Sequence, residues 1–179
     1  MARTFQFSID DLTALMALMP APVFDNRRRR GFAYDGKTLT VQDDGEAARL
    51  QTILADPRWR DRALMTQLKG YAAHARYQKE IAGITVNGIP VATDRDGQMR
   101  AMAAQVMATA DPTMVFHWKK ADGSFAQLTA DQVVAIGKAV VMHVQACFGA
   151  EASIHAALSA NPALMTQARI DAMFAAIRV

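Results

Sequence analysis

The longest periodic segment of the sequence runs from Ala130 to about Ala160 and constrains the fold most. Thr129 and Gln132 form a Thr-x-x-Gln capping box at its start, and Asn161-Pro162 ends it because proline cannot continue a helix. Between them, a stripe recurs with a period of about 3.5 to 3.6 residues. The stripe comprises Val133, Ile136 or Gly137, Val140, Val144, Cys147, Glu151, Ile154 and Leu158. The segment therefore predicts one long helix whose apolar face must be covered, within the chain or between chains.

Short β-branched or aromatic runs are separated by Asp-Gly or Asn-Gly pairs at three places. These are Asp35-Gly36 between 31–34 and 37–41, Asn87-Gly88 between 84–86 and 89–92, and Asp122-Gly123 between 114–118 and 125–128. Asp-Gly and Asn-Gly favour two-residue hairpin turns, because both central residues there need positive φ. The sequence thus predicts two or three short hairpins, with Pro90 placing its strand at a sheet edge.

Further helical patterns lie between these hairpins. A helix follows the capping residue Ser8, and others are predicted over 46–55, 58–81, 94–110 and 163–177. Thr93 or Asp94 can cap the helix whose apolar residues include Met99, Met102, Val106 and Met107. The fold class is therefore α+β and helix-rich, with two or three short hairpins and a long C-terminal helix. The best domain boundary is Asp56-Pro57, which separates a small N-terminal α+β docking unit (1–56) from a helix-hairpin-helix-hairpin-long-helix domain (57–179).

The composition indicates a globular protein rather than a disordered or membrane protein. The 179 residues are 51% hydrophobic, rich in alanine and methionine, and only 7% aromatic, which suits close and adaptable helix packing. No stretch of eighteen consecutive apolar residues and no signal-peptide pattern occurs, so we expect synthesis in the cytoplasm and no membrane partner. The net charge of +3 is too small to predict nucleic-acid binding by itself.

Residue spacings of known catalytic or metal-binding motifs do not occur. The four histidines form no His-Glu-x-x-His or His-x-His pattern, and Asp94-Arg95-Asp96-Gly97 lacks the later ligands of a calcium loop. The single cysteine, Cys147, lies in the apolar helical pattern and is interpreted as a buried hydrophobic residue, although His143 lies one turn away. We therefore expect no enzyme activity, no metal and no cofactor, with a cell-wall hydrolase kept as the enzymatic alternative.

A run of four arginines is the one cluster of charge in the sequence, and it precedes the first hairpin. A solvated loop, a contact to an acidic partner surface and nucleic-acid binding are all compatible with it. Nucleic acid is the least favoured of these, because no second basic cluster and no aromatic platform accompanies the run. The four residues are Arg27, Arg28, Arg29 and Arg30.

From Tyr77 to about Leu158 the sequence resembles a known family, the domain of unknown function 4376, found in tail, tail-fibre and related proteins of phages and prophages. The matching segments are Tyr77–Val91, Ala92–Arg95, Trp118–Phe125, Leu128-Thr129, Ala139–Phe148 and Glu151. The usual glutamine after Arg95 is kept at Gln98. The family brings no catalytic residues that can be carried over to this chain.

The resemblance implies a structural component of a bacteriophage tail: a tail-tip, baseplate or fibre-attachment subunit that acts by protein–protein contacts in the virion. A tail-fibre assembly chaperone that leaves before the particle matures is the alternative. Tail parts assemble with symmetry, so we expect a homo-oligomer, with a trimer favoured, and other tail proteins as partners. The residues predicted to bind partners are Arg27, Arg28, Arg29, Arg30, Val140, Val144, Ile154 and Leu158.

Overall fold

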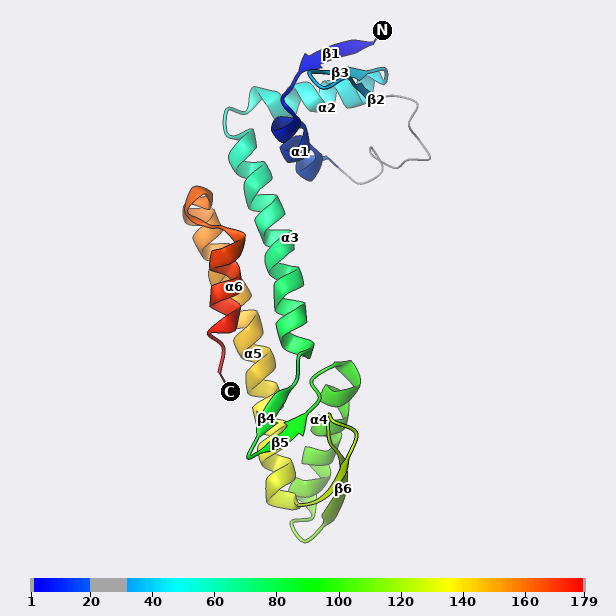
Figure 1. The fold of residues 1–179 in the computed structure, drawn as a ribbon, viewed down its shortest axis with the longest axis vertical. Helices are drawn as coiled ribbons and strands as arrows, with labels where there is room; N and C mark the ends of the chain where they lie inside the picture. The colour runs from blue at the N-terminus through cyan, green and yellow to red at the C-terminus, as the bar shows by residue number, and fades with distance from the viewer. Residues whose placement is uncertain (1, 20–31, 179) are drawn as a thin grey trace. The chain divides into compact units, whose positions relative to one another are not determined.

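The computed structural model describes residues 2–19 and 32–178 (Figure 1). Within these residues the chain forms six α-helices and three small antiparallel sheets, which confirms the predicted helix-rich α+β class. The chain divides into two compact units: unit 1 comprises Met1–Gly70 and Ala157–Met165, and unit 2 comprises Tyr71–Ala156 and Thr166–Val179. The units thus divide within the third helix, whereas the predicted boundary at Asp56-Pro57 lies at that helix's start.

Unit 1 begins with a three-stranded sheet and two short helices. Its elements are β1 (Arg3–Gln6), α1 (Ile9–Leu18), β2 (Phe32–Tyr34), β3 (Thr38–Val41), α2 (Asp44–Ala55) and the first half of α3 (Trp59–Ile81). The strand order is β1-β3-β2, with both pairings antiparallel. The Ser8 hydroxyl accepts a hydrogen bond from the Asp11 amide (3.0 Å), which confirms the predicted cap of α1.

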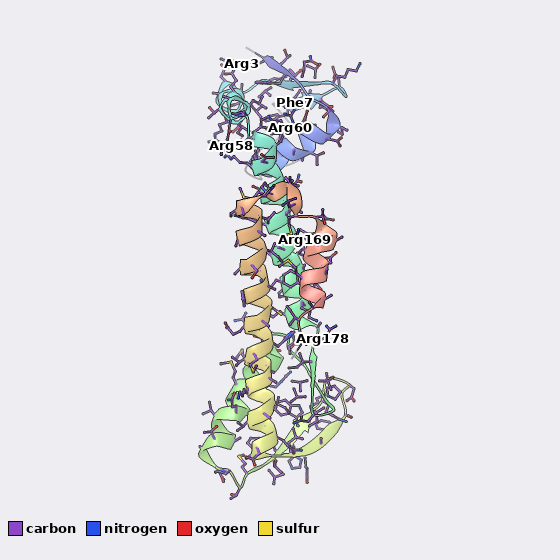
Figure 2. All side chains as sticks on the ribbon, turned by 90° about the vertical axis from the view of Figure 1, so that its left-hand side faces the viewer. Arg3, Phe7, Arg58, Arg60, Arg169 and Arg178 are labelled. Atoms are coloured by element: carbon purple, nitrogen blue, oxygen red, sulfur yellow. The ribbon has the colours of Figure 1, made fainter. Side chains whose placement is uncertain are left out.

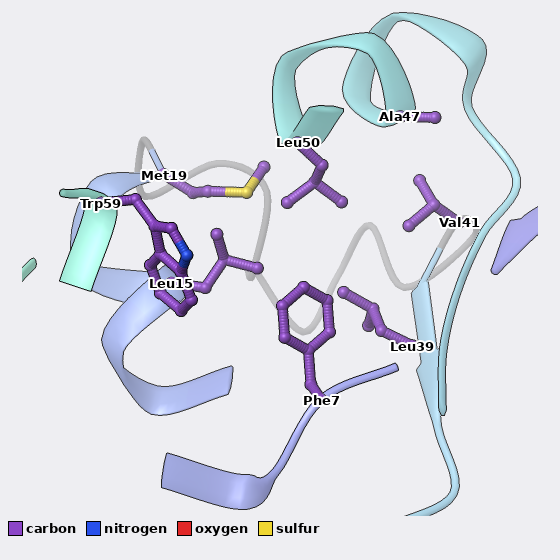
Figure 3. Packing of buried hydrophobic residues seen from close by; sticks show 8 residues of the cluster. All are labelled: Phe7, Leu15, Met19, Leu39, Val41, Ala47, Leu50 and Trp59. Atoms are coloured by element: carbon purple, nitrogen blue, oxygen red, sulfur yellow. The ribbon is translucent and has the colours of Figure 1, made fainter. Parts of the chain in front are cut away.

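The core of unit 1 lies between its sheet and its helices (Figure 3). It consists of Phe7, Leu15, Met19, Leu39, Val41, Ala47, Leu50 and Trp59. Leu39 and Val41 alternate with more exposed threonines, as a strand with one covered face requires. Figure 2 labels Arg60 near the start of α3. Its guanidinium binds Asp11 of α1 with two hydrogen bonds (2.7 and 3.0 Å) and holds the pKa of that carboxyl below its usual range.

The three hairpins predicted at Asp-Gly or Asn-Gly pairs differ in their turns. At Asp122-Gly123 only Gly123 takes positive φ (+85°), and the Lys120 amide donates to the Ser124 carbonyl (2.8 Å) across a three-residue loop in place of the predicted two-residue turn. Asn87 (φ +50°) and Gly88 (φ +78°) both take positive φ and join β4 (Ile84–Val86) to β5 (Ile89–Val91), which confirms that turn. The prediction for Asp35-Gly36 is wrong in detail, because only Gly36 takes positive φ. Asp35 instead accepts hydrogen bonds on its side chain from the amides of Lys37 and Thr38. The register of β2 and β3 and the hydrogen bond from the Asp35 amide to the Thr38 carbonyl (3.3 Å) thus place the two-residue turn at Gly36 and Lys37, one residue later than predicted.

Unit 2 contains the other two hairpins and the longest helix. Its further elements are α4 (Arg95–Ala110), β6 (Val115–Lys119), β7 (Phe125–Thr129), α5 (Ala130–Ala160, whose last turn belongs to unit 1) and α6 (Gln167–Ala175). The capping box at Thr129 and Gln132 forms as predicted, with hydrogen bonds in both directions. The predicted helix over 163–177 is divided into a 3-10 turn (Pro162–Leu164) and α6, which Thr166 caps.

Small residues let the helices of unit 2 approach closely around its core. That core consists of Val91, Ala101, Ala108, Leu128, Ala130, Val133, Ile136 and Val140. At Gly137 a Cβ atom would lie 2.3 Å from Oε1 of Gln105, so α4 and α5 touch where α5 has no side chain. At Gly97 a Cβ atom would lie 2.3 Å from the Ala92 carbonyl oxygen, so α4 packs directly against the backbone before it.

The contact at Gly97 yields a prediction about stability. We expect Gly97→Ala to destabilise the protein by about 1–3 kcal/mol, because the added methyl group meets rigid backbone. Gly149→Ala is the matched control: nothing lies within 4 Å of its Cβ position in α5, so the better helix propensity should stabilise by up to about 1 kcal/mol. Urea unfolding of both variants measures the difference, and equal effects of the two changes would contradict the close packing at Gly97.

Candidate functional site

Polar side chains gather at the C-terminal end of α3, in unit 2. The last carbonyl groups of a helix have no partner inside the helix, and here side chains supply it. Nε2 of His143 lies 3.0 Å from the Lys79 carbonyl oxygen and 3.2 Å from that of Glu80. The Thr93 hydroxyl donates to the Glu80 carbonyl (2.5 Å) and accepts from the Gly83 amide (2.9 Å). A side chain from α5 and one from the loop after β5 therefore cap α3.

A cluster of charges surrounds this cap. Arg76 forms ion pairs with Glu80 and with Glu151, whose Oε2 lies 2.9 Å from the guanidinium Nε. All three side chains are at most 18% exposed. Gln98 donates to the Glu80 carboxylate (3.0 Å), and the Arg76 guanidinium also stacks over the Phe148 ring. Removing one partner of such a half-buried network would leave a charge without compensation, so the network fixes α3, α4 and α5 in one register.

The pair of Cys147 and His143 is not arranged as an activated nucleophile. The thiol sulfur lies 3.9 Å from Nε2 of His143. Because carbonyl oxygens only accept hydrogen bonds, the Nε2 atom that faces two of them carries the proton and cannot take another from the thiol. Burial raises the pKa of the Cys147 thiol, and the nearby Glu80 carboxylate adds to the rise. Cys147 is fully buried, which confirms its interpretation as a hydrophobic residue.

A second candidate site is an apolar face on α4. Met99, Met102, Val106 and Met107 recur at i, i+3, i+7 and i+8 and are 60%, 54%, 68% and 51% exposed. Val141 of α5, 43% exposed, extends this face across a groove of about 380 Å³ that Met102, Gln105, Val106 and Thr109 also line. Contiguous exposed apolar residues of this kind are typical of protein interaction sites. We refer to these five apolar residues as the α4 face.

Comparison with protein families gives a match for this chain. Residues 62–177, well over half of its length, match the family described as domain of unknown function DUF4376. The chain belongs to this family. The DUF4376 domain extends beyond the stretch 77–158 that carries the sequence resemblance, and it includes the α3 cap, its charged network and the α4 face. No curated protein and no solved structure matches the chain.

The residues predicted to bind partners do not coincide with the exposed α4 face. Val140, Ile154 and Leu158 are 1%, 0% and 0% exposed, so these side chains lie inside the chain and are not presented to a partner. Val144 is half-buried. The stripe of α5 is covered by the chain itself, which was one of the two arrangements that its periodicity allowed. Arg27, Arg28, Arg29 and Arg30 lie outside the described residues.

The length and apolar composition of α5 resemble those of a membrane-spanning helix. In the described part of the chain it is the one helix that is long and apolar enough to cross a membrane, and 33% of its most apolar window is buried. Length and composition are the sole basis of that match. In this DUF4376 domain, however, His143 and Glu151 of α5 are bound to the backbone and side chains of α3. Insertion of α5 into a bilayer would break these interactions.

The cap of α3 yields a prediction for the DUF4376 domain. Thr93→Val should destabilise the protein by about 1–3 kcal/mol, because the buried Thr93 hydroxyl would no longer accept from the half-buried Gly83 amide or donate to the Glu80 carbonyl. Thr109→Val is the control, since its exposed hydroxyl donates only to the Gln105 carbonyl within α4. Chemical unfolding of the two variants measures the difference in their free energies of unfolding. If Thr93→Val proves no more harmful than Thr109→Val, the hydroxyl does not hold the end of α3.

Proposed function

We propose that this DUF4376 protein is a structural component of a bacteriophage tail, a tail-tip, baseplate or fibre-attachment subunit that acts by protein–protein contacts and not by catalysis. Two observations stand behind the proposal, one for the family and one for the tail assignment. The family match supports membership of DUF4376. The resemblance of residues 77–158 to tail and tail-fibre proteins supports the tail assignment. On this proposal the protein is made in the host cytoplasm and resides in the virion.

The observation that carries the contact role is the exposed α4 face. Burial of a valine or methionine side chain typically contributes about 1.5–3 kcal/mol, and here five such side chains stand together at 43–68% exposure. A homo-oligomer, with a trimer favoured, would bury this face against its own copies, because closed symmetry repeats one patch on every subunit. Other tail proteins are the remaining partners in this proposal.

An assembly chaperone for tail fibres is the second candidate, and the composition of the α4 face favours it. Three of its five residues are Met99, Met102 and Met107. Methionine is unbranched and polarisable, so a methionine-rich surface adapts to several partners. A chaperone needs such adaptability because it contacts a fibre that is not yet folded and then releases it.

The first test concerns the α4 face. Val106→Asp should leave the melting temperature nearly unchanged, since Val106 is 68% exposed, but should lower the oligomer mass measured by light scattering. Ile9→Asp is the matched control, because Ile9 is also exposed (61%) but lies in α1 of unit 1. We expect this control to retain the wild-type mass. A wild-type chain that stays monomeric at every concentration would exclude the homo-oligomer.

The second test separates the two proposed roles. Mass spectrometry of purified phage particles should detect the chain at a fixed ratio to the other tail proteins if it is a structural subunit. A chaperone should be abundant in infected or induced cells and absent from particles. Absence from particles would therefore reject the structural role, and a constant stoichiometry in particles would reject the chaperone.

A further inference from the structure

A slot of about 250 Å³ lies between α4 and β6 in unit 2. Its lining residues are Ala92, Gly97, Arg100, Ala104, Phe116, His117, Trp118 and Lys119. The last four are consecutive in β6. Side chains of a strand alternate between its two faces, so four consecutive residues line one slot only from the edge of the strand. The other edge of β6 is paired with β7, so the slot follows the free edge of β6.

The alternation of backbone hydrogen bonds along β6 identifies the groups that face the slot. The Lys120 amide donates to the Ser124 carbonyl (2.8 Å), next to the register pair Trp118–Ala126. In an antiparallel pair such bonds occur at every second residue, so Phe116 and Trp118 bond to β7. The amides and carbonyls of His117 and Lys119 therefore point outward. Two residues on, the Ala121 amide does so as well and donates to the Pro90 carbonyl (3.1 Å).

These outward groups of His117 and Lys119 have no hydrogen-bond partner in the part of the chain that the structure describes. A strand edge with free donors and acceptors is a template for another extended chain. On the opposite wall α4 presents the small residue Ala104, one turn from the cation Arg100, which leaves room for such a chain.

The charges of the slot are all of one sign. Arg100 and Lys119 line it, no carboxylate does, and Arg100 forms no ion pair within the described residues. A carboxylate that entered the slot would meet these cations without displacing an acid already bound there. A small anion would satisfy Arg100 but would leave the backbone row of His117 and Lys119 unpaired. Pairing with β6 of a second copy would bring the same basic residues opposite each other.

We propose that the free edge of β6 binds an extended polypeptide segment with acidic side chains, which adds to the β6–β7 hairpin as a third strand. Backbone hydrogen bonds to His117 and Lys119 would give affinity, and Arg100 would select the acidic side chain. This site is separate from the α4 face and does not depend on the tail assignment. It names the chemistry of one partner: an extended, acidic segment of another protein.

The test uses the full chain, isotope-labelled for NMR, and a seven-residue peptide of alternating valine and aspartate with blocked ends. We expect the His117 and Lys119 amide signals to shift at millimolar peptide, and a peptide with lysine in place of aspartate to have no effect. His117→Pro should abolish binding, because proline removes an outward amide that this chain does not use, and prolines are tolerated at sheet edges. Gln127→Pro is the matched control, since Gln127 is the register partner of His117 on the opposite edge, and it should bind normally.

A second pair of variants tests the charge. Arg100→Gln should weaken binding of the aspartate peptide about two- to fivefold, as expected for a partly exposed ion pair. Arg95→Gln, an exposed change on α4 outside the slot, should not weaken it. Melting curves of all variants confirm that each is folded.

Four outcomes would overturn the proposal. The first is no shift with the aspartate peptide, and the second is equal binding of the lysine peptide. The third is that sodium acetate alone reproduces the shifts in both wild type and His117→Pro, which would make the slot a small-anion site. The fourth is that the wild type self-associates and His117→Pro abolishes this, which would assign the edge to a second copy.

Discussion

The capping of α3 is the interaction on which unit 2 depends. The helix ends at Ile81, and its last carbonyls would lack these hydrogen-bond partners if His143 and Thr93 did not reach them. Because these two residues come from α5 and from the loop before α4, one set of hydrogen bonds fixes three helices together. The half-buried ion pairs of Arg76 reinforce the same arrangement, since a shift of α5 along α3 would separate Arg76 from Glu151.

Once the helices are fixed in this way, unit 2 has an apolar interior and an apolar exterior with different roles. The stripe of α5 around Val140 is covered by the chain and supplies stability. Among residues 2–19 and 32–178, none covers the α4 face or the edge of β6, and each offers a different kind of contact. The α4 face offers apolar contact, which is non-directional and adaptable. The β6 edge offers directional hydrogen bonds beside Arg100.

The chemistry of the interior is consistent with a structural role. Nε2 of His143 faces two backbone carbonyls, Glu80 and Glu151 are paired with Arg76, and the tautomer of His143 prevents its Nε2 atom from activating Cys147. The groups available for contacts therefore lie on the surface. They include Met102 and Val106 of α4 and the outward amide of His117.

The sequence by itself determined the elements, because their signals are local: the capping box at Thr129, the Asn87-Gly88 turn and the period of α5 are contained in short windows. It also determined which face of α5 is apolar. Only the tertiary structure decided what covers that face, since periodicity is the same whether a helix packs against its own chain or another. For the same reason the sequence could not show that Val140 is buried while Val106 is exposed. The α3 cap and the free edge of β6 depend on contacts between residues far apart in the chain, which no local pattern contains.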